Sequence, residues 1–403
     1  MGFEQSVKAE APAPVQRNRH VVVTALGITQ ILAWGSSYYL PAVLAAPIAK
    51  DTGWSVASVV AGLSCGLLLA GLVSPVTGQL IQRHGGRPVL AAGSLLVAAA
   101  HSLLATATAY PLYLVAWLLM GLGMSSSLYD AGFATLGRLY GGSARGAITN
   151  LTLFGGFAST VCWPLSVFLV EHGGWRVACL SYAAIHLAIC LPLHLWVIPP
   201  PPPAAPMPVR DRSKEASATG RTRTRFILLA SIQTLAAMIA STLSVHLLTL
   251  LQLRGIGLAA AVGLGALVGP SQVGARVAEL LIGRNRHHPI WTMLASVSLL
   301  AAGIWLLLTS QTFIALALIL YGAGNGIHTI ARGALPLVLF DPQQYATLMG
   351  KLATPSLIIQ AAAPSIGALL LGVGGGNLVL IALAAAATLN VGLCASLVAA
   401  VRR

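Results

Sequence analysis

Charged side chains are scarce in this chain of 403 residues. Asp, Glu, Lys and Arg make up 8% of it, whereas a soluble globular domain usually carries roughly 25%. So few charges cannot cover the surface of a water-soluble protein of this length, and the composition therefore excludes a set of soluble domains. It also excludes a disordered chain and a coiled coil, because both depend on many charged or polar residues.

The chain also has few cysteines and lacks the common catalytic and nucleotide-binding motifs. The cysteines lie inside apolar runs without a CxxC spacing, at Cys65, Cys162, Cys179, Cys190 and Cys394. We interpret them as small buried side chains, with soft-metal ligation as the alternative. No Walker-type loop, HExxH or GxSxG occurs in an aqueous segment. The sequence therefore predicts neither an enzyme nor an ATP-driven pump, and no cofactor or metal.

Long apolar runs dominate the chain, of which 57% is hydrophobic. A membrane-spanning helix needs about 20 mostly apolar residues. Twelve runs of this kind fall near 21–46, 54–81, 88–107, 111–136, 147–170, 175–198, 226–253, 258–283, 289–309, 311–336, 348–372 and 377–401. The first run is too long for a signal-peptide core, so we expect it to stay attached. The sequence thus predicts an all-α polytopic membrane protein with twelve transmembrane helices.

A proline- and arginine-rich segment divides these runs into two sets of six. Five consecutive prolines at 199–203 precede the basic cluster Arg210, Arg212, Lys214, Arg221, Arg223 and Arg225. Proline disrupts helices, and the charges exclude the segment from hydrocarbon. We therefore expect a tail at 1–20, a six-helix bundle at 21–198, an aqueous linker at 199–225 and a second six-helix bundle at 226–401.

The basic residues are distributed unevenly across the predicted membrane. With the N-terminus inside, seventeen of the 23 Lys and Arg residues fall on inner segments, three on outer loops and three within spans. Because Lys and Arg are retained on the cytoplasmic side, both termini and the linker are expected in the cytoplasm. The expected location is the plasma membrane, a bacterial inner membrane. The net charge of +14 then reflects topology and predicts no nucleic-acid partner, and we expect a monomer.

The two halves resemble each other in sequence. Gly121-Leu122-Gly123 recurs as Gly322-Ala323-Gly324, and Pro164 recurs as Pro364, at offsets of 201 and 200 residues. A basic loop around Arg83 recurs around Arg284. Two pseudo-symmetric six-helix bundles are typical of transporters in which one half rocks against the other around a central site.

A specific loop motif lies between the second and third runs. The segment Gly78-Gln79-Leu80-Ile81-Gln82-Arg83-His84-Gly85-Gly86-Arg87 resembles the loop signature of the major facilitator superfamily, roughly Gly-x-Leu-x-Asp-Arg-x-Gly-Arg-Arg. Gln82 replaces the usual acid. The resemblance covers the whole chain and implies the fold and the secondary-transport activity of that family.

A narrower resemblance concerns the substrate. Gly53-Trp54-Ser55 and Gln272-Val273-Gly274-Ala275-Arg276 resemble segments of the monocarboxylate and oxalate–formate transporter branch. That branch places an arginine near the substrate carboxylate in its eighth span, which implies this role for Arg276, with Gln272 one turn before it. The oxalate–formate members add a lysine in the eleventh span, which implies a role for Lys351. The resemblance points to an anionic substrate.

Ionisable residues within the spans are functional candidates, because a charge deep in the bilayer costs about 2.5–3.5 kcal/mol or more. The planar guanidinium of Arg276 suits a bidentate clamp on a carboxylate, and a structural pair with Glu279 one turn below is the alternative. Lys351 either neutralises an anionic substrate or extends to the cytoplasmic surface. The positive surplus among these groups favours an anionic or neutral polar substrate.

The tenth span carries a polar stripe. Asn325, His328 and Arg332 follow one another at helical spacing, so we expect them to face a cavity. His328 is a proton-sensitive candidate, since imidazole titrates near neutral pH. The alternative has His328 as a hydrogen-bonded interior residue and Arg332 as part of the cytoplasmic gate.

The fourth span holds the single deep acid of the first half, Asp130. It is either a proton carrier or a gate residue paired with Arg87 or Arg138, and the family resemblance favours the gate, to which Arg83 is also assigned. Proton coupling is expected to rest on Asp130, Glu279 and His328.

Further candidates lie in the first span and its repeat. Gln30 and Trp34 are expected to line the central cavity, and Gln233 is the repeat counterpart of Gln30. Tyr38 and Tyr39 either join them or belong to an aromatic belt at the membrane interface.

These features predict a secondary active transporter for a small organic solute, an anion such as a carboxylate, working by alternating access with proton coupling as a further hypothesis. The alternative functions are efflux of a toxic amphipathic or metalloid compound and uptake of a vitamin-like solute. The remaining alternatives are a membrane-embedded sensor or scaffold and a membrane enzyme.

Overall fold

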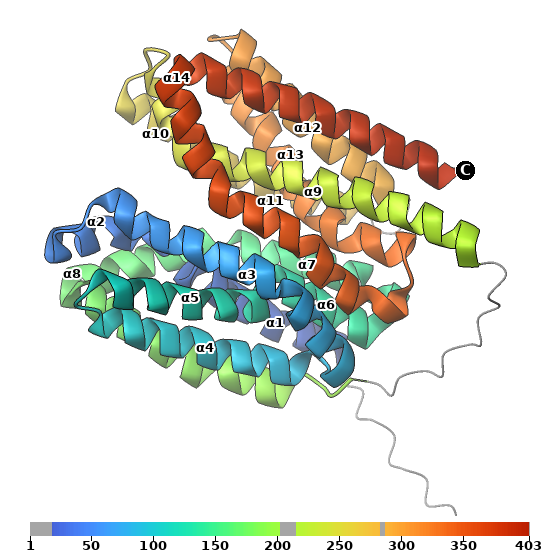
Figure 1. The fold of residues 1–403 in the computed structure, drawn as a ribbon, viewed down its shortest axis with the longest axis horizontal. Helices are drawn as coiled ribbons and strands as arrows, with labels where there is room; N and C mark the ends of the chain where they lie inside the picture. The colour runs from blue at the N-terminus through green and yellow to red at the C-terminus, as the bar shows by residue number, and fades with distance from the viewer. Residues whose placement is uncertain (1–17, 202–214, 283–286, 403) are drawn as a thin grey trace, which may run out of the picture.

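The computed structural model describes residues 18–201, 215–282 and 287–402, and every regular element in this part of the chain is a helix (Figure 1). The first half contains α1 (Arg19–Ser36), α2 (Pro41–Thr52), α3 (Val56–His84), α4 (Gly86–Thr106), α5 (Tyr110–Ser127), α6 (Tyr129–Tyr140), η1 (Gly141–Ala144), α7 (Arg145–Gly156), α8 (Ala158–Ile185), η2 (His186–Cys190) and η3 (Leu193–Val197). The second half contains α9 (Glu215–Gln252), α10 (Leu258–Gly265), α11 (Val268–Ile282), α12 (Pro289–Thr309), α13 (Ile314–Leu339), η5 (Pro342–Gln344) and α14 (Tyr345–Arg402). The all-α prediction is confirmed.

Nine helical stretches of the described chain are long and apolar enough to cross a membrane. Two of them cover 88 and 61 residues, far more than the roughly 20 that one crossing needs. Each contains a glycine with positive φ at which the helix direction changes, Gly174 inside α8 and Gly375 inside α14. The count of twelve crossings stays a prediction.

Several expected spans are broken in the middle. The first run divides into α1 and α2 before Pro41, and the fourth divides into α5 and α6 at Leu128, whose backbone is extended. Irregular backbone inside a membrane protein is tolerated where protein buries it or a cavity adjoins it. Both breaks lie beside the interface between the halves, and the second one positions Asp130.

The helices form two groups that follow the halves of the sequence. In Figure 1 the blue and green helices of the first half lie below the yellow to red helices of the second half. The repeated glycines make equivalent close contacts in the two halves. A Cβ on Gly121 of α5 would lie 2.3 Å from the Gly66 carbonyl oxygen of α3. A Cβ on Gly322 of α13 would lie 2.8 Å from the Val268 carbonyl oxygen of α11. Small residues at these crossings let the helices approach closely.

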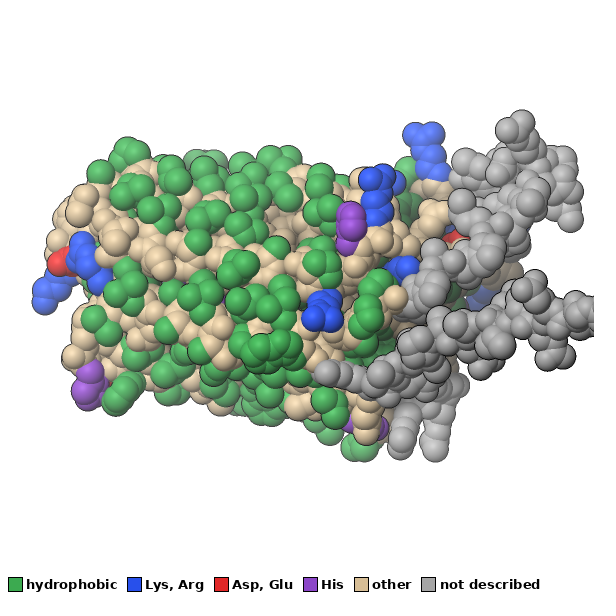
Figure 2. Space-filling view, turned by 90° about the horizontal axis from the view of Figure 1, so that it is seen from below, with side chains coloured by type: hydrophobic (Ala, Val, Ile, Leu, Met, Phe, Trp, Pro, Cys, Tyr) green, Lys and Arg blue, Asp and Glu red, His purple; other side chains and the backbone are tan. Residues whose placement is uncertain are grey.

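The outer surface suits a lipid environment. Figure 2 shows hydrophobic side chains over most of one face, with most of its charged side chains towards the two ends of the molecule. Exposed apolar side chains such as Leu72, Phe168 and Leu369 continue this surface. In water such a surface would be an aggregation site, so its extent supports burial in a bilayer.

One helix begins before its apolar run. The linker was expected at 199–225, and α9 begins at Glu215 and includes Arg221, Arg223 and Arg225; the domain boundary itself stays a prediction. Basic residues have good helix propensity once they are outside hydrocarbon, so the helix extends beyond its apolar part. The tail at 1–17 and the charges Arg210, Arg212, Lys214, Arg284 and Arg286 lie outside the described residues.

Candidate functional site

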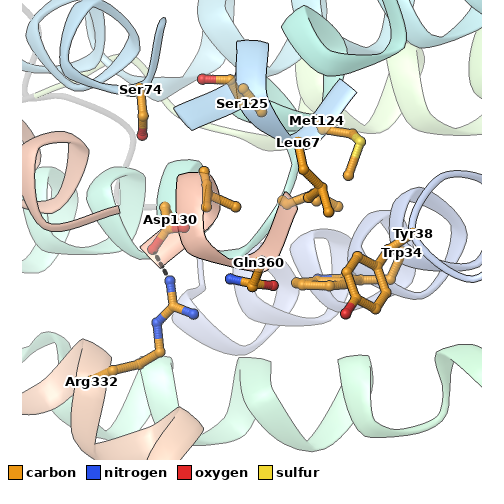
Figure 3. Close-up of a pocket in the computed structure, with 12 residues that line it drawn as sticks. Trp34, Tyr38, Leu67, Ser74, Met124, Ser125, Asp130, Arg332 and Gln360 are labelled. Carbon is orange, nitrogen blue, oxygen red and sulfur yellow. Dashed lines mark hydrogen bonds and ion pairs between the residues drawn. The ribbon is translucent and has the colours of Figure 1, made fainter. Parts of the chain in front are cut away.

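A pocket lies between the two halves, near the breaks in the first and fourth spans (Figure 3). The empty space between these side chains is about 420 Å³ when the part open to solvent is counted, and about 20 Å³ of it can hold the centre of a water-sized molecule. Its lining consists of Trp34, Tyr38, Leu67, Ala70, Ser74, Met124, Ser125, Leu128 and Asp130 from the first half and Arg332, Leu357 and Gln360 from the second. Apolar walls with a few polar groups are typical of small-molecule sites.

An ion pair between the halves forms one end of this pocket. The carboxylate of Asp130 accepts a hydrogen bond from Nη2 of Arg332, and their side chains are 15% and 17% exposed. Arg87 or Arg138 was expected to pair with Asp130, and the structure pairs it with Arg332. One contact of Arg138 is a hydrogen bond from its Nε to the Gln82 carbonyl at 3.4 Å. Asp130 follows the helix break at Leu128 and therefore faces the opposite half. Of the other gate candidates, Arg87 is partly buried and Arg83 is exposed.

Arg276 is held differently. Its side chain is 5% exposed, and its guanidinium donates to the Gly326 carbonyl at 3.2 Å, the Thr152 carbonyl at 3.0 Å and Thr329 Oγ1 at 3.5 Å. All three acceptors are neutral, so no carboxylate among the described residues compensates this charge. The Thr152 contact crosses from α11 to α7 of the other half.

The alternative pair of Arg276 with Glu279 is therefore wrong. Glu279 accepts a hydrogen bond from Thr292 Oγ1 at 2.9 Å and lies 3.8 Å from Arg145 and 3.4 Å from His287. The same Arg145 donates to the His287 carbonyl at 2.8 Å. Glu279 thus belongs to a polar contact between α7 and α11, nearer the loops than Arg276.

Polar contacts between the halves concentrate towards one end of the molecule, which we call the basic end and define by the loops at residues 84–86, 140–145 and 340–345. Besides the Arg145 contacts, Gln82 Nε2 donates across the interface to the Gln343 carbonyl at 2.5 Å. Gln82 is the residue that replaces the acid of the loop motif, and its amide makes a direct contact between the halves. These contacts correspond to an arrangement closed at the basic end.

The polar stripe of the tenth span is only partly brought into the site. Arg332 lines the pocket, whereas His328 is 7% exposed and its Nδ1 lies 3.4 Å from Ser296 Oγ on α12. Asn325 is partly buried on the same helix. The contact of His328 with Ser296 matches its interpretation as an interior residue.

The glutamine candidates are distributed around the interface. Gln30 is fully buried and donates to the Ser127 carbonyl at 2.6 Å, and it accepts from Trp34 Nε1 at 3.2 Å. Gln30 thereby stabilises the break at Leu128 and orients Trp34. Gln233 is buried, and its Nε2 has no hydrogen-bond partner among the described residues.

Two further candidates lie away from the pocket lining. Gln272 is partly buried, and its backbone packs against Gly326. Lys351 is exposed near the start of α14 and is not among the pocket residues.

The comparisons with known proteins agree with this architecture. The sequence profile of the Major Facilitator Superfamily matches residues 26–286. The chain belongs to the major facilitator superfamily. It is accordingly a polytopic membrane transporter for a small molecule and not an enzyme, as predicted.

Individual relatives are distant. Rat (Rattus norvegicus) monocarboxylate transporter 3 is 33% identical over 144 residues, which is 35% of this chain and 27% of that protein. The human organic anion transporter MFSD10 (TETRAN) superposes with a TM-score of 0.73 at 17% identity, covering 94% of this chain and all of that one. The superfamily transporter FucP, in its outward conformation, gives a TM-score of 0.72 at 14% identity over 94% of this chain and 99% of its own.

Some pocket residues of this superfamily member were not predicted from sequence. Gln360, Ser74 and Ser125 line the pocket, but single polar residues in long apolar helices are common and carry no distinguishing pattern. The pairing of Asp130 with Arg332 had a usable signal, because their separation of 202 residues nearly equals the internal repeat. Residues at equivalent positions of two pseudo-symmetric halves face each other across the axis.

Proposed function

We propose that this superfamily member is a secondary transporter that moves a small organic anion, such as a carboxylate, across the plasma membrane by alternating access. In this proposal the bundles 21–198 and 226–401 rock against each other, and the basic end faces the cytoplasm with both termini. The coupling ion is a proton carried by Asp130.

The observation that carries the proposal is the buried guanidinium of Arg276 with neutral acceptors alone. A buried charge without a counter-ion costs several kcal/mol, and carbonyl dipoles offset only part of this. A carboxylate makes shorter and roughly twice as strong hydrogen bonds with a guanidinium, often in bidentate geometry. An anion is therefore the ligand that would stabilise the buried guanidinium of Arg276 most.

The Thr152 contact links such binding to movement of the halves. Arg276 belongs to α11 and Thr152 to α7, so separation of the halves at this level would free Nη1 of the guanidinium. An anion that takes the freed donor stabilises the separated arrangement, because a ligand shifts an equilibrium by its differential affinity. The rat relative is named a monocarboxylate transporter and the human structural neighbour an organic anion transporter, and both names support an anionic substrate.

Proton coupling is proposed at Asp130 because its carboxylate forms an ion pair with the Arg332 guanidinium inside the pocket. A proton on Asp130 would neutralise this carboxylate and release the guanidinium for an anion. Flux of the anion that does not respond to a pH gradient across the membrane would contradict this part of the proposal.

The test is uptake of labelled carboxylates into proteoliposomes, compared with the corresponding uncharged amides. Arg276→Ala should reduce the transport efficiency for carboxylates about 10- to 100-fold, the loss expected for hydrogen bonds to a charged group worth about 1.5–3 kcal/mol, and Arg276→Lys should recover only part of it.

The matched control is Arg176→Ala, which removes an exposed arginine paired with Asp51 and should leave uptake unchanged. Intact carboxylate flux in a folded Arg276→Ala protein would overturn the proposal.

A further inference from the structure

An aromatic cluster includes the two rings that line one side of the pocket, Trp34 and Tyr38 (Figure 3). The ring of Trp34 has its centroid 5.4 Å from Tyr38, 6.1 Å from Tyr39 and 5.2 Å from Tyr129. Tyr39 continues the cluster to Trp163 at 6.2 Å. These separations are typical of edge-to-face and tilted ring contacts, and we call the five residues the aromatic cluster.

The rings of the cluster are only partly covered. Trp34, Tyr38 and Tyr39 are partly exposed, and Trp163 is 44% exposed. Tyr129 alone is buried. Trp34 and Tyr38 are pocket-lining residues, and Figure 3 shows their rings together on one side of the pocket, with Gln360 between them and Arg332.

The cluster is not an interface belt. Trp34 and Tyr38 line the pocket between the halves together with Leu357 and Gln360 of α14. These rings therefore face the other half of the protein, whereas a membrane belt would place them at the lipid surface.

Positive groups flank the rings. Arg332 lines the same pocket as Trp34 and Tyr38, and Arg276 Nη1 and the Tyr129 hydroxyl both donate to the Thr152 carbonyl, at 3.0 and 3.3 Å. A ligand lying against the rings of Trp34 and Tyr38 would therefore present its polar end to one or both guanidinium groups. This juxtaposition fits a flat apolar ligand with an anionic group at its edge.

We propose that the anion is an aromatic carboxylate, whose ring packs in the aromatic cluster while its carboxylate meets Arg276 or Arg332. The inference rests on the proposed anion transport and names the substrate class of that site. Small aliphatic acids would use the guanidinium contact alone. They would leave the rings uncovered and therefore bind more weakly.

The test compares three probes on the purified full-length protein: benzoate, cyclohexanecarboxylate and benzamide. Benzoate and cyclohexanecarboxylate share the charge and nearly the size, and benzamide keeps the ring without the charge. Affinities are measured by ligand-induced thermal shift and by quenching of tryptophan fluorescence, and uptake is measured in proteoliposomes. Benzoate should bind about tenfold more tightly than cyclohexanecarboxylate, because aromatic ring contacts of typical strength supply a free-energy difference of that size. The difference in affinity between benzoate and benzamide should be larger than tenfold.

Variants then locate the preference. Trp34→Leu and Tyr38→Leu should each bring the ratio of benzoate to cyclohexanecarboxylate affinity close to one, while Trp34→Phe and Tyr38→Phe should retain it. The matched control is Trp54→Leu, since Trp54 belongs to a separate ring group with Tyr110 and Tyr113 and should leave the ratio unchanged. The conservative variants keep the test informative if a leucine variant fails to fold.

The outcomes separate the two proposals. Equal binding of benzoate and cyclohexanecarboxylate, both better than benzamide, overturns the aromatic preference and leaves anion transport standing. Equal binding of benzoate and benzamide overturns the anion proposal. Absence of binding and uptake for all three probes overturns the aromatic preference, whereas the anion proposal is decided by the carboxylate uptake of Arg276→Ala described above.

Discussion

Removing the carboxylate of Asp130 should open the basic end of the protein. In the closed arrangement Arg332 and Asp130 are 17% and 15% exposed, so the variant Asp130→Asn leaves a largely buried guanidinium without its counter-charge. Breaking one partner of a fully buried pair costs about 3–5 kcal/mol, whereas an exposed pair contributes about 0.2–1 kcal/mol. For the observed exposure we expect about 2 kcal/mol, which shifts the equilibrium about 30-fold towards the open arrangement.

The population of the open arrangement can be measured by alkylation of a buried cysteine. Ile148 is fully buried and packs against Gly333 of the other half, so Ile148→Cys, in a background without the native cysteines, reacts only when the halves separate. Its reaction rate with a maleimide should rise about 30-fold with Asp130→Asn. Ser143→Cys, at an exposed position of the first half, reports the intrinsic reactivity and should not change.

The charge-swapped variant Asp130→Arg with Arg332→Asp restores a pair of the same two groups. We expect it to return the alkylation rate of Ile148→Cys most of the way to the original value. A rate that stays the same in Asp130→Asn would refute the reasoning, because it would mean that the pair contributes nothing to closure of the basic end.

Three predictions concern stability, measured by thermal unfolding of the purified protein. Burial, with a smaller effect of Arg145, lowers the pKa of His288 below 6.5, and neutral His288 caps α12 through its Nδ1. The stabilisation by this cap is present above about pH 6.5 and is lost as the pH falls through the lowered pKa. His288→Asn should therefore flatten the pH dependence of the melting temperature, and an unchanged profile would contradict this prediction. Arg254 donates to carbonyl groups in the last turn of α12, so Arg254→Met should cost about 1–3 kcal/mol and Arg254→Lys less; equal melting temperatures would argue against this cap. His101 is fully buried, and neither ring nitrogen has a partner among the described residues, so His101→Leu should raise the melting temperature by removing an unsatisfied polar group, whereas a fall would indicate that the ring has a partner such as bound water.

Hydropathy predicted where helices lie because it depends on local composition. The expected run at 289–309 coincides with α12, which begins at a proline, a residue that favours the first position of a helix. The runs at 21–46 and 111–136 contain breaks that hydropathy does not register, since an apolar residue such as Leu128 is equally apolar in extended backbone. Those breaks position the pocket, so the part of the fold nearest the site was the least predictable.

The site was predictable in its residue types and less so in its contacts. Asp130 and Arg332 were expected as gate residues because a charge inside a span requires compensation, but their pairing depends on how the two halves face each other. The partners of Arg276 were not predictable at all, because two of them are backbone carbonyls, of Thr152 and Gly326. Every residue supplies a carbonyl, and the sequence therefore holds no trace of which one is used.

The two guanidinium groups of the interface solve the same burial problem in different ways. Arg332 is neutralised by Asp130 and holds the halves together through a charge, whereas Arg276 holds them together through the Thr152 carbonyl. An incoming anion competes easily with a carbonyl and poorly with a resident carboxylate. Under the proposed function Arg276 is then the first group to receive the anion, and Arg332 becomes available only when Asp130 is protonated or withdrawn. In this order, every contact that the anion replaces is also a contact that keeps the basic end closed. Binding of the anion and opening of that end are therefore thermodynamically linked.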